Sequence, residues 1–395
     1  MGAIANSNSK ETDSGFVGRL ESLRGLAALA VASGHCFLIN MPPGPQQTII
    51  KLLLIGINGR AAVSVFFVLS GYVLGLGLRR SRRSFAAEYR AFTIRRVLRI
   101  APALAACTLL AWAYVSWIYQ PPTDPTPDIQ RCDTYAKHYL GWDWKLIALN
   151  FLGFNQDLNP VTWTLRVEVV WALLLPSLHW LSLRLAGGFR LLGILLLIVM
   201  CYLSPWRSIF EFGFMFYLGY LLPDYADKAR TLFARSTWVP WLGLGITLVL
   251  LLPSRYLHGA WLKTGVLLEG LGSAGLILTI VYGGAPGIGR ILDHAAARFY
   301  GRISYSFYLL HAPLLFACVQ FLFPVIPRNV WVGQPLLLGT ALSLISIGIA
   351  SAVAWVFYVY VEKPFIFISR LLCAAWVDRR PMNIREEFWK EYITK

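Results

Sequence analysis

Long apolar segments recur along this chain, and they limit its fold more than any other feature. A helix needs about 20 apolar residues to cross a bilayer core of about 30 Å. Ten segments approach or exceed this length: 22–40, 60–78, 98–119, 163–183, 190–204, 207–222, 238–252, 262–282, 303–323 and 333–361. With 57% hydrophobic and only 14% charged residues, a soluble domain is implausible. The sequence predicts an all-α, polytopic membrane bundle of about ten transmembrane helices.

The basic residues are divided unevenly between the two sides that these spans define. If the N-terminus is cytoplasmic, 26 of the 36 Lys and Arg residues lie on the inner side, nine on the outer side and Arg166 within a span. Cytoplasmic loops of membrane proteins carry such an excess of Lys and Arg. The ratio therefore predicts that both termini are cytoplasmic. It also explains most of the net charge of +16 without a nucleic-acid partner.

The chain divides into a membrane domain, 19–365, and two polar ends. Residues 1–18 are rich in Ser and Asn and are predicted to be disordered. The cytoplasmic tail, 366–395, contains the amphipathic REEFWKEYI, which predicts a helix along the inner membrane surface. The longest outer loop, 120–162, is rich in Pro, Asp, Tyr and Trp. This composition suits sugar binding, and it equally suits an interfacial aromatic belt.

Cysteine usage and the first span indicate neither metal binding nor secretion. The six cysteines are scattered, mostly within apolar segments and without a C-x-x-C pair, so they suggest no metal site and no disulfide framework. The first span lacks a small-x-small cleavage site and has a histidine in its core. We therefore expect it to remain in the mature protein as a helix.

The first span carries two ionisable residues, Arg24 and His35. A separation of eleven residues corresponds to about 16 Å and three helical turns, only about 20° out of phase, so both residues lie on one stripe of one helix. Ionisable groups at membrane depth usually face a bundle interior or a cavity and mark a reaction centre or a pathway. The alternative is that Arg24 snorkels to the membrane surface and His35 is a hydrogen-bonded packing residue.

Two arginines and a serine provide further candidates. Arg96 and Arg99 lie one helical turn apart before Pro102, so they can face one target together. Because guanidinium groups bind phosphate through paired hydrogen bonds, we expect nucleotide binding there, with membrane anchoring as the alternative. Ser70 offers a small polar position at mid-membrane, suited to hydrogen bonding across helices or simply to packing.

Two later spans contribute Glu168 and His311. At membrane depth Glu168 needs a partner, which Arg166, a histidine or a substrate hydroxyl could supply. A carboxylate beside a histidine would fix its tautomer and raise its basicity, whereas a structural ion pair is the alternative. His311 is a second histidine at membrane depth, with a role either in chemistry or in packing.

Several motifs follow one another in the order found in a known family. RLESLRGLAALAVASGH, FFVLSGY, R-x-x-R before a proline, TWTLRVE, ISYSFYLLH and VEKPF resemble the motifs of the membrane-bound acyltransferase-3 family. The resemblance extends from Leu20 to Phe365 and implies that 19–365 is an acyltransferase-3 domain. The site residues that we predict with it are His35, Glu168 and His311 for catalysis, Arg24, Arg96 and Arg99 for donor binding, and Glu21, Ser70, Trp163 and Tyr305 for support.

The resemblance implies an integral membrane O-acyltransferase. Such an enzyme would move an acyl group, most often acetyl, from cytoplasmic acyl-CoA to a hydroxyl of a carbohydrate-type acceptor, such as a polysaccharide or a lipid-linked glycan, without a metal. His35 would be the base, because its ordinary pKa is near neutrality, either in direct transfer or through an acyl-histidine. In a bacterium it would lie in the plasma (inner) membrane. The alternatives are a transporter or flippase for a lipid-linked sugar, and a sensor or scaffold that has lost activity.

Overall fold

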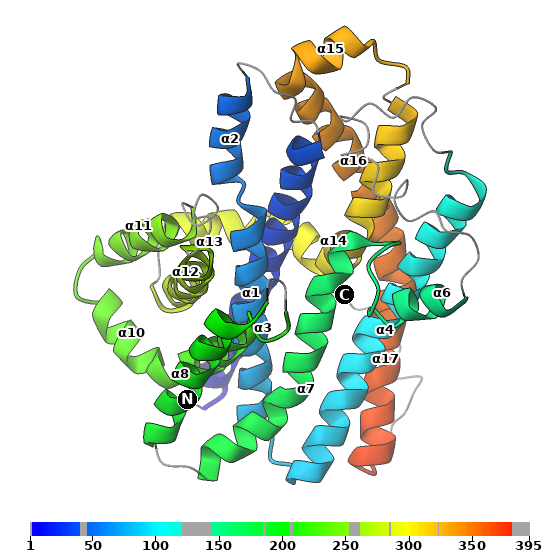
Figure 1. The fold of residues 1–395 in the computed structure, drawn as a ribbon. Coiled ribbons are helices and arrows are strands. Elements are labelled where there is room, and N and C mark those ends of the chain that lie inside the picture. Colours follow the sequence, from blue (N-terminus) through cyan, green and yellow to red (C-terminus); the bar gives the residue numbers. More distant parts are fainter. Residues whose placement is uncertain are drawn as a thin grey trace.

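The computed structural model describes residues 2–39, 46–120, 144–184, 187–205, 208–252, 261–283, 286–322 and 324–380, with side chains from Gly18 onward. Every regular element in these ranges is helical, and most of the long helices stand side by side (Figure 1). The all-α class is therefore confirmed for the described residues. Residues 2–18, for which disorder is predicted, form the first part of helix α1 (Gly2–Ile39). Two predictions lie largely or wholly outside the described residues: the composition-based role of the loop 120–162 and the helix in the tail.

The first half of the chain supplies four long helices and several short elements. In chain order these are α1 (Gly2–Ile39), α2 (Gln47–Gly56), α3 (Gly59–Arg80), α4 (Phe85–Trp117), α6 (Trp144–Phe151), the 3-10 turn η1 (Pro160–Thr162) and α7 (Trp163–Arg184). Two asparagines fix where helices begin. The side-chain oxygen of Asn58 accepts from two N–H groups at the start of α3, and Asn159 caps η1 in the same way, as N-cap residues typically do.

The second half adds the remaining helices. These are α8 (Gly187–Leu203), α9 (Gly213–Leu221), the 3-10 turn η2 (Leu222–Tyr225), α10 (Ala226–Phe233), α11 (Val239–Leu251), α12 (Leu262–Tyr282), α13 (Pro286–Asp293), α14 (Ala295–Leu322), α15 (Arg328–Gly333), α16 (Pro335–Phe357), η5 (Tyr358–Glu362), α17 (Lys363–Leu372) and η6 (Cys373–Val377), where η5 and η6 are π-helical. Figure 1 shows α10, α11 and α12 on one flank of the upright helices, and α2 and α15 at their upper end.

Glycines allow the central helices to touch through their backbones. A Cβ atom added to Gly25 of α1 would lie 2.4 Å from the backbone of Tyr300 and Gly301 on α14. At the crossing of α3 and α9, a Cβ on Gly71 or Gly219 would lie 2.0 Å from a backbone oxygen of the opposing helix. No other residue type fits such approaches. The contact at Gly25 fixes α1 against α14, the two helices that carry His35 and His311.

Within the described residues, six helical segments are long and apolar enough to cross a membrane: Gln47–Arg80, Phe85–Trp117, Pro160–Arg184, Leu262–Tyr282, Ala295–Leu322 and Pro335–Val377. Two shorter apolar helices are Arg190–Leu203 and Val239–Leu251. A full span is predicted over 207–222, but α9 has only nine residues, about 13 Å, because the chain turns into η2 where Pro223 follows. The predicted total of ten spans is therefore not confirmed.

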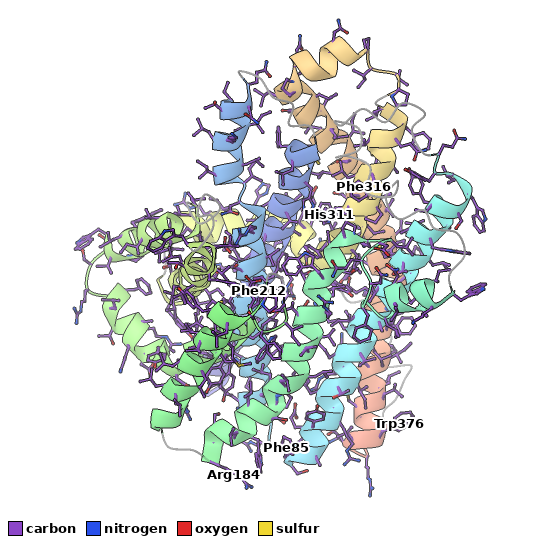
Figure 2. All side chains as sticks on the ribbon, in the orientation of Figure 1. Phe85, Arg184, Phe212, His311, Phe316 and Trp376 are labelled. Carbon is purple, nitrogen blue, oxygen red and sulfur yellow. The ribbon has the colours of Figure 1, made fainter. Side chains whose placement is uncertain are left out.

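Ion pairs tie the helices together at the end of the bundle that contains Phe85, Arg184 and Trp376 (Figure 2). Arg79 of α3 pairs with Asp224 of η2 at 2.5 Å. Arg83, in the turn between α3 and α4, binds both carboxylate oxygens of Asp378, at 2.7 and 2.9 Å. The hydrogen bonds from Arg83 lower the pKa of Asp378. This arginine-rich end is therefore held by charge, whereas the middle of the bundle is held by close packing.

Candidate active site

A cavity of about 50 Å³ lies where α1, α3, α4, α7 and α14 meet. Its charged lining residues are Arg24, Arg96, Arg99 and Glu168, and its hydroxyl-bearing lining residues are Thr164, Ser304, Tyr305 and Tyr308. A cavity of this size accommodates a few water molecules or the narrow end of a ligand. All three arginines that the sequence predicts for donor binding are thus brought together in one pocket, with Glu168 among them.

Glu168 has partners other than those that the sequence suggested. Its carboxylate accepts a hydrogen bond from the guanidinium of Arg96 and one from Ser70 Oγ at 3.1 Å. Neither Arg166 nor a histidine is bonded to Glu168, and the alternative of a structural ion pair within the bundle is the one observed, with Arg96. Residues two apart on a helix face different sides, which keeps Arg166 from Glu168, whereas α3 and α4 bring Ser70 and Arg96 to it.

The other two arginines of the pocket are not neutralised by a direct partner. Within the part of the chain that the structure describes, neither Arg24 nor Arg99 has a hydrogen bond or an ion pair, and the Nε atom of Arg96 is buried without a partner. Arg99 and Arg96 both repel the charge of Arg24, and Glu168 attracts it. Three guanidinium groups thus line a pocket beside one carboxylate, an arrangement suited to an anionic ligand.

A second carboxylate, Glu362, lies behind this pocket. Its side chain is buried and accepts a hydrogen bond from Ser306 Oγ at 2.9 Å, and it interacts electrostatically with Arg99 and Arg24. The sequence identified Glu362 only as part of the closing VEKPF motif. A carboxylate at membrane depth needs a charged or polar partner. The position of Glu362 near the end of the last span could therefore have predicted that it lies close to the arginines.

The two histidines form a hydrogen-bonded pair. His35 Nδ1 lies 3.1 Å from His311 Nε2, and the rings stack with centroids 5.3 Å apart and planes 14° apart. His311 Nδ1 donates to the backbone carbonyl of Tyr308 at 2.7 Å, since a carbonyl can only accept. When both rings are neutral, His311 Nε2 therefore accepts a hydrogen bond from the Nδ1–H group of His35. The Nε2 atom of His35 is then the nitrogen that can take up a proton.

A proline sets the local geometry of α14 beside His311. Pro313 has no N–H to bond the carbonyl of Leu309 four residues earlier. That carbonyl instead accepts from Asn159 Nδ2 at 2.8 Å and from Cys107 Sγ at 3.2 Å. The α14 helix is thereby held against η1 and α4 at the level of the histidine pair, which Figure 2 shows in the upper half of the bundle at His311.

Tyr308 connects the pocket with the histidine pair. It lines the cavity, its ring centroid lies 5.5 Å from that of His311, and its hydroxyl is 3.0 Å from Thr164 Oγ1. Neither histidine lines the cavity itself. The sequence did not single out Tyr308, although its position three residues before His311 on one helix face was a usable signal.

Of the remaining predicted residues, Tyr305 lies in the cavity wall, and Trp163 and Glu21 lie outside it. Tyr305 lines the cavity and donates to the carbonyl of Ile100 at 2.9 Å. Trp163 packs against the rings of Phe67 and Phe212, outside the cavity lining. Glu21 is exposed and attracts the charge of Arg24. No cluster of three or more His, Cys, Asp or Glu side chains suited to a metal occurs among the described residues.

Together these features define an all-helical integral membrane protein with charged and titratable groups gathered inside the bundle, as in a membrane enzyme. The family model of the acyltransferase-3 domain matches residues 17–361, and the chain belongs to this family. O-acetyltransferase PaAT-1 of Phomopsis amygdali is 26% identical over 372 residues, covering 75% of this chain and 71% of the relative. No solved structure matches. The family and this relative identify a membrane O-acyltransferase.

Proposed function

We propose that the chain transfers an acyl group, acetyl in the first instance, from acyl-CoA to a hydroxyl of a carbohydrate-type acceptor such as a polysaccharide or a lipid-linked glycan. The relative's description as an O-acetyltransferase supports acetyl as the group and oxygen as the acceptor atom. The donor is inferred from the family resemblance and from the geometry argued below, and the acceptor class from the family resemblance alone.

The spacing between the arginine pocket and the histidine pair carries the proposal. Arg24 and His35 lie eleven residues apart on α1, which is about 16 Å along a helix. In acyl-CoA, about 13 bonds of the pantetheine arm join the inner phosphate to the thioester sulfur, and an extended chain of that length covers about 15 Å. Phosphate at the arginines therefore places the thioester beside His35.

The proposed reaction uses His35 as a general base. Its Nε2 atom removes the proton from the acceptor hydroxyl while the hydroxyl oxygen attacks the thioester carbonyl. The carbon–sulfur bond then breaks, and the thiolate leaves with the proton that His35 held. His311 keeps His35 in the competent tautomer by accepting from its Nδ1. The alternative is a two-step route, in which His35 itself attacks the thioester to form an acyl-histidine and the acceptor hydroxyl then takes the acyl group from it.

The pocket residues have separate proposed roles. Arg24, Arg96 and Arg99 hold the donor's phosphates, and Glu168 orients Arg96 with the help of Ser70. Tyr305, Trp163 and Glu21 support the surrounding helices. These roles are assigned within an acyltransferase-3 domain over 19–365, followed by a cytoplasmic tail.

The proposed membrane topology places both termini in the cytoplasm, so that the arginine-rich end meets soluble acyl-CoA. In a bacterium the membrane would be the plasma (inner) membrane. The uneven distribution of Lys and Arg supports this orientation.

The proposal is tested by acetyl-CoA binding and hydrolysis with the purified full chain in detergent. We expect saturable binding to be lost when Arg96 and Arg99 are both changed to Ala, and slow hydrolysis to be lost in His35→Ala. A folded wild-type protein that binds no acyl-CoA of any chain length would contradict the proposal and favour the transporter alternative.

A further inference from the structure

Ser304 of α14 is a buried serine whose hydroxyl has no partner among the described residues. It lines the cavity, only 3% of the residue is exposed, and no hydrogen bond to its Oγ atom occurs within the described ranges. Two other buried helical serines, Ser273 and Ser346, donate to the carbonyl four residues earlier, as helical serines commonly do. The Ser304 hydroxyl is therefore available to a ligand in the cavity.

Tyr308 stands one helical turn beyond Ser304 and lines the same cavity. Its hydroxyl lies 3.0 Å from Oγ1 of Thr164, which also lines the cavity. A hydroxyl has one hydrogen to donate and two lone pairs that accept, so this pair retains the capacity to bond a polar group of a ligand. Ser304 and Tyr308 thus place two hydroxyl positions on one face of α14, one turn apart.

Apolar side chains make up the rest of the cavity wall around these hydroxyls. They are Val63, Phe66, Phe67, Ile100 and Leu165. The Tyr305 hydroxyl is already bonded to the Ile100 carbonyl, at 2.9 Å. An apolar wall with a few placed polar groups suits a slender ligand whose own polar groups are separated by hydrocarbon. The pantetheine arm of acyl-CoA has this pattern, with two amides spaced along a chain of methylene groups.

The helices α1 and α14 run parallel and in register, which allows positions on both to be compared. Gly25 packs against Gly301, and His35 bonds His311. On each helix the histidine lies ten residues beyond the glycine. Because both helices rise by about 1.5 Å per residue, a level on α14 corresponds to a level on α1 throughout this stretch. The level of Arg24, one residue before Gly25, is that of the residue before Gly301.

The spacing of the two hydroxyls along α14 matches the spacing of the amides in the donor arm. From the level of Arg24 toward the histidine pair, Ser304 lies about 6 Å and Tyr308 about 12 Å further along. In the pantetheine arm, the two amide carbonyl carbons follow the inner phosphorus by roughly five and nine bonds, about 6 and 11 Å in an extended chain. With the phosphate at the arginines, each hydroxyl is therefore level with one amide.

We propose that Ser304 binds the amide nearer the phosphate, and that Tyr308 with Thr164 binds the amide nearer the sulfur, an inference that rests on the proposed function. An amide offers one carbonyl that accepts and one N–H that donates, and a hydroxyl can bond either group. Two such contacts fix the arm lengthwise, which holds the thioester at the level of His35. They also select pantetheine thioesters over acyl donors without this arm, such as acyl phosphates.

The test measures dissociation constants by calorimetry with the purified full chain in detergent. The ligands are CoA, which carries both amides and no acyl group to lose, and two CoA analogues in which two methylene groups replace one amide. The proximal analogue lacks the amide nearer the phosphate, and the distal analogue lacks the amide nearer the sulfur. We expect wild type to bind each analogue about tenfold more weakly than CoA.

Two variants assign each hydroxyl to one amide. Ser304→Ala should bind CoA about tenfold more weakly than wild type and lose nothing further with the proximal analogue, while the distal analogue still binds more weakly. Tyr308→Phe should show the reverse pattern. Tyr300→Phe and Ser351→Ala are matched controls, because their hydroxyls lie 3.0 Å apart outside the cavity lining. Both controls should bind all three ligands as wild type does.

The pairing of each variant with one analogue separates amide binding from a structural role. If each variant weakened the binding of CoA and of both analogues by the same factor, the proposal would be overturned. Equal affinity of wild type for CoA and both analogues would overturn it without any variant. Both results leave CoA binding, and with it the proposed function, intact. A folded wild type that does not bind CoA would overturn the proposed function and this proposal together.

Discussion

The arginine pocket and the histidine pair share α1 and α14 but treat their polar groups in opposite ways. In the pocket, Arg24 and Arg99 lack direct partners among the described residues. In the pair, the hydrogen bonds run in order from His35 to His311 and on to the Tyr308 carbonyl. A site with unsatisfied cations is prepared to bind a charged ligand, whereas a satisfied neutral pair is prepared to hold one nitrogen in a fixed protonation state. The difference assigns ligand binding to the arginine pocket and proton transfer to the histidine pair.

The largest expected effect comes from removing the base. His35→Ala should lower the turnover number by about 10³-fold, the usual contribution of a positioned general base, while acetyl-CoA still binds through the arginines. Turnover is measured as release of free CoA thiol, and binding by calorimetry on the same preparation. Near-normal turnover in a folded His35→Ala protein would remove the histidine pair from the reaction.

Replacing the second histidine should have a smaller effect. His311→Leu removes the acceptor for His35 Nδ1 and should lower turnover by about 10- to 100-fold, as expected for the loss of a buried orienting hydrogen bond. His311→Gln is the matched variant, because its side-chain oxygen can still accept, and it should retain more activity. Equal losses in the two variants would point to packing rather than to tautomer control.

Asn159 tests whether the part of α14 beside Pro313 depends on a hydrogen-bond donor from outside the helix. Asn159→Ala leaves the Leu309 carbonyl with only the weak thiol donor Cys107. Unfolding in mixed detergent micelles should show a loss of about 1–3 kcal/mol, with turnover reduced more than donor binding. An unchanged free energy of unfolding would mean that the carbonyl finds another partner.

The smallest effect is expected at the arginine-rich end, away from both groups. Because hydrogen bonds from Arg83 lower the pKa of Asp378, this pair stabilises the fold above the ordinary carboxyl pKa and loses its effect as the pH falls through the lowered value. Asp378→Asn should cost about 0.5–1 kcal/mol near pH 7, and the difference should shrink below about pH 4. A difference that grows on acidification would contradict this assignment.

Much of the helical architecture was predictable, because apolar length reports membrane spans directly. The shorter apolar segments were harder. The predicted span 207–222 contains a helix of only nine residues, since hydropathy does not reveal where a chain turns. In the site, the motifs grouped Arg24 with Arg96 and Arg99. They did not predict which residues surround these arginines in the folded chain.

The partners of buried groups were the least predictable part. Spacing within α1 could place Arg24 and His35 on one stripe, but nothing in that spacing could pair His35 with His311, 276 residues away. An ion pair was one of the alternatives for Glu168, but the sequence did not identify Arg96 as its partner, because only the packing of α4 against α7 brings the two side chains together. Asn159 donates to the Leu309 carbonyl, which Pro313 leaves without its helical partner. Tyr308 accepts from His311 through its backbone carbonyl. Side-chain motifs do not report such backbone contacts.

The most direct test of the account measures how activity depends on the donor's phosphates. The efficiency kcat/KM is compared for acetyl-CoA, acetyl-dephospho-CoA, S-acetyl-4′-phosphopantetheine and S-acetylpantetheine, in wild type and in Arg99→Ala. We predict that wild type loses little efficiency until the last phosphate is removed, then falls by about 10- to 100-fold, and that Arg99→Ala no longer distinguishes the last two donors. Equal efficiency with all four donors in wild type would contradict a phosphate-binding role for the arginine pocket.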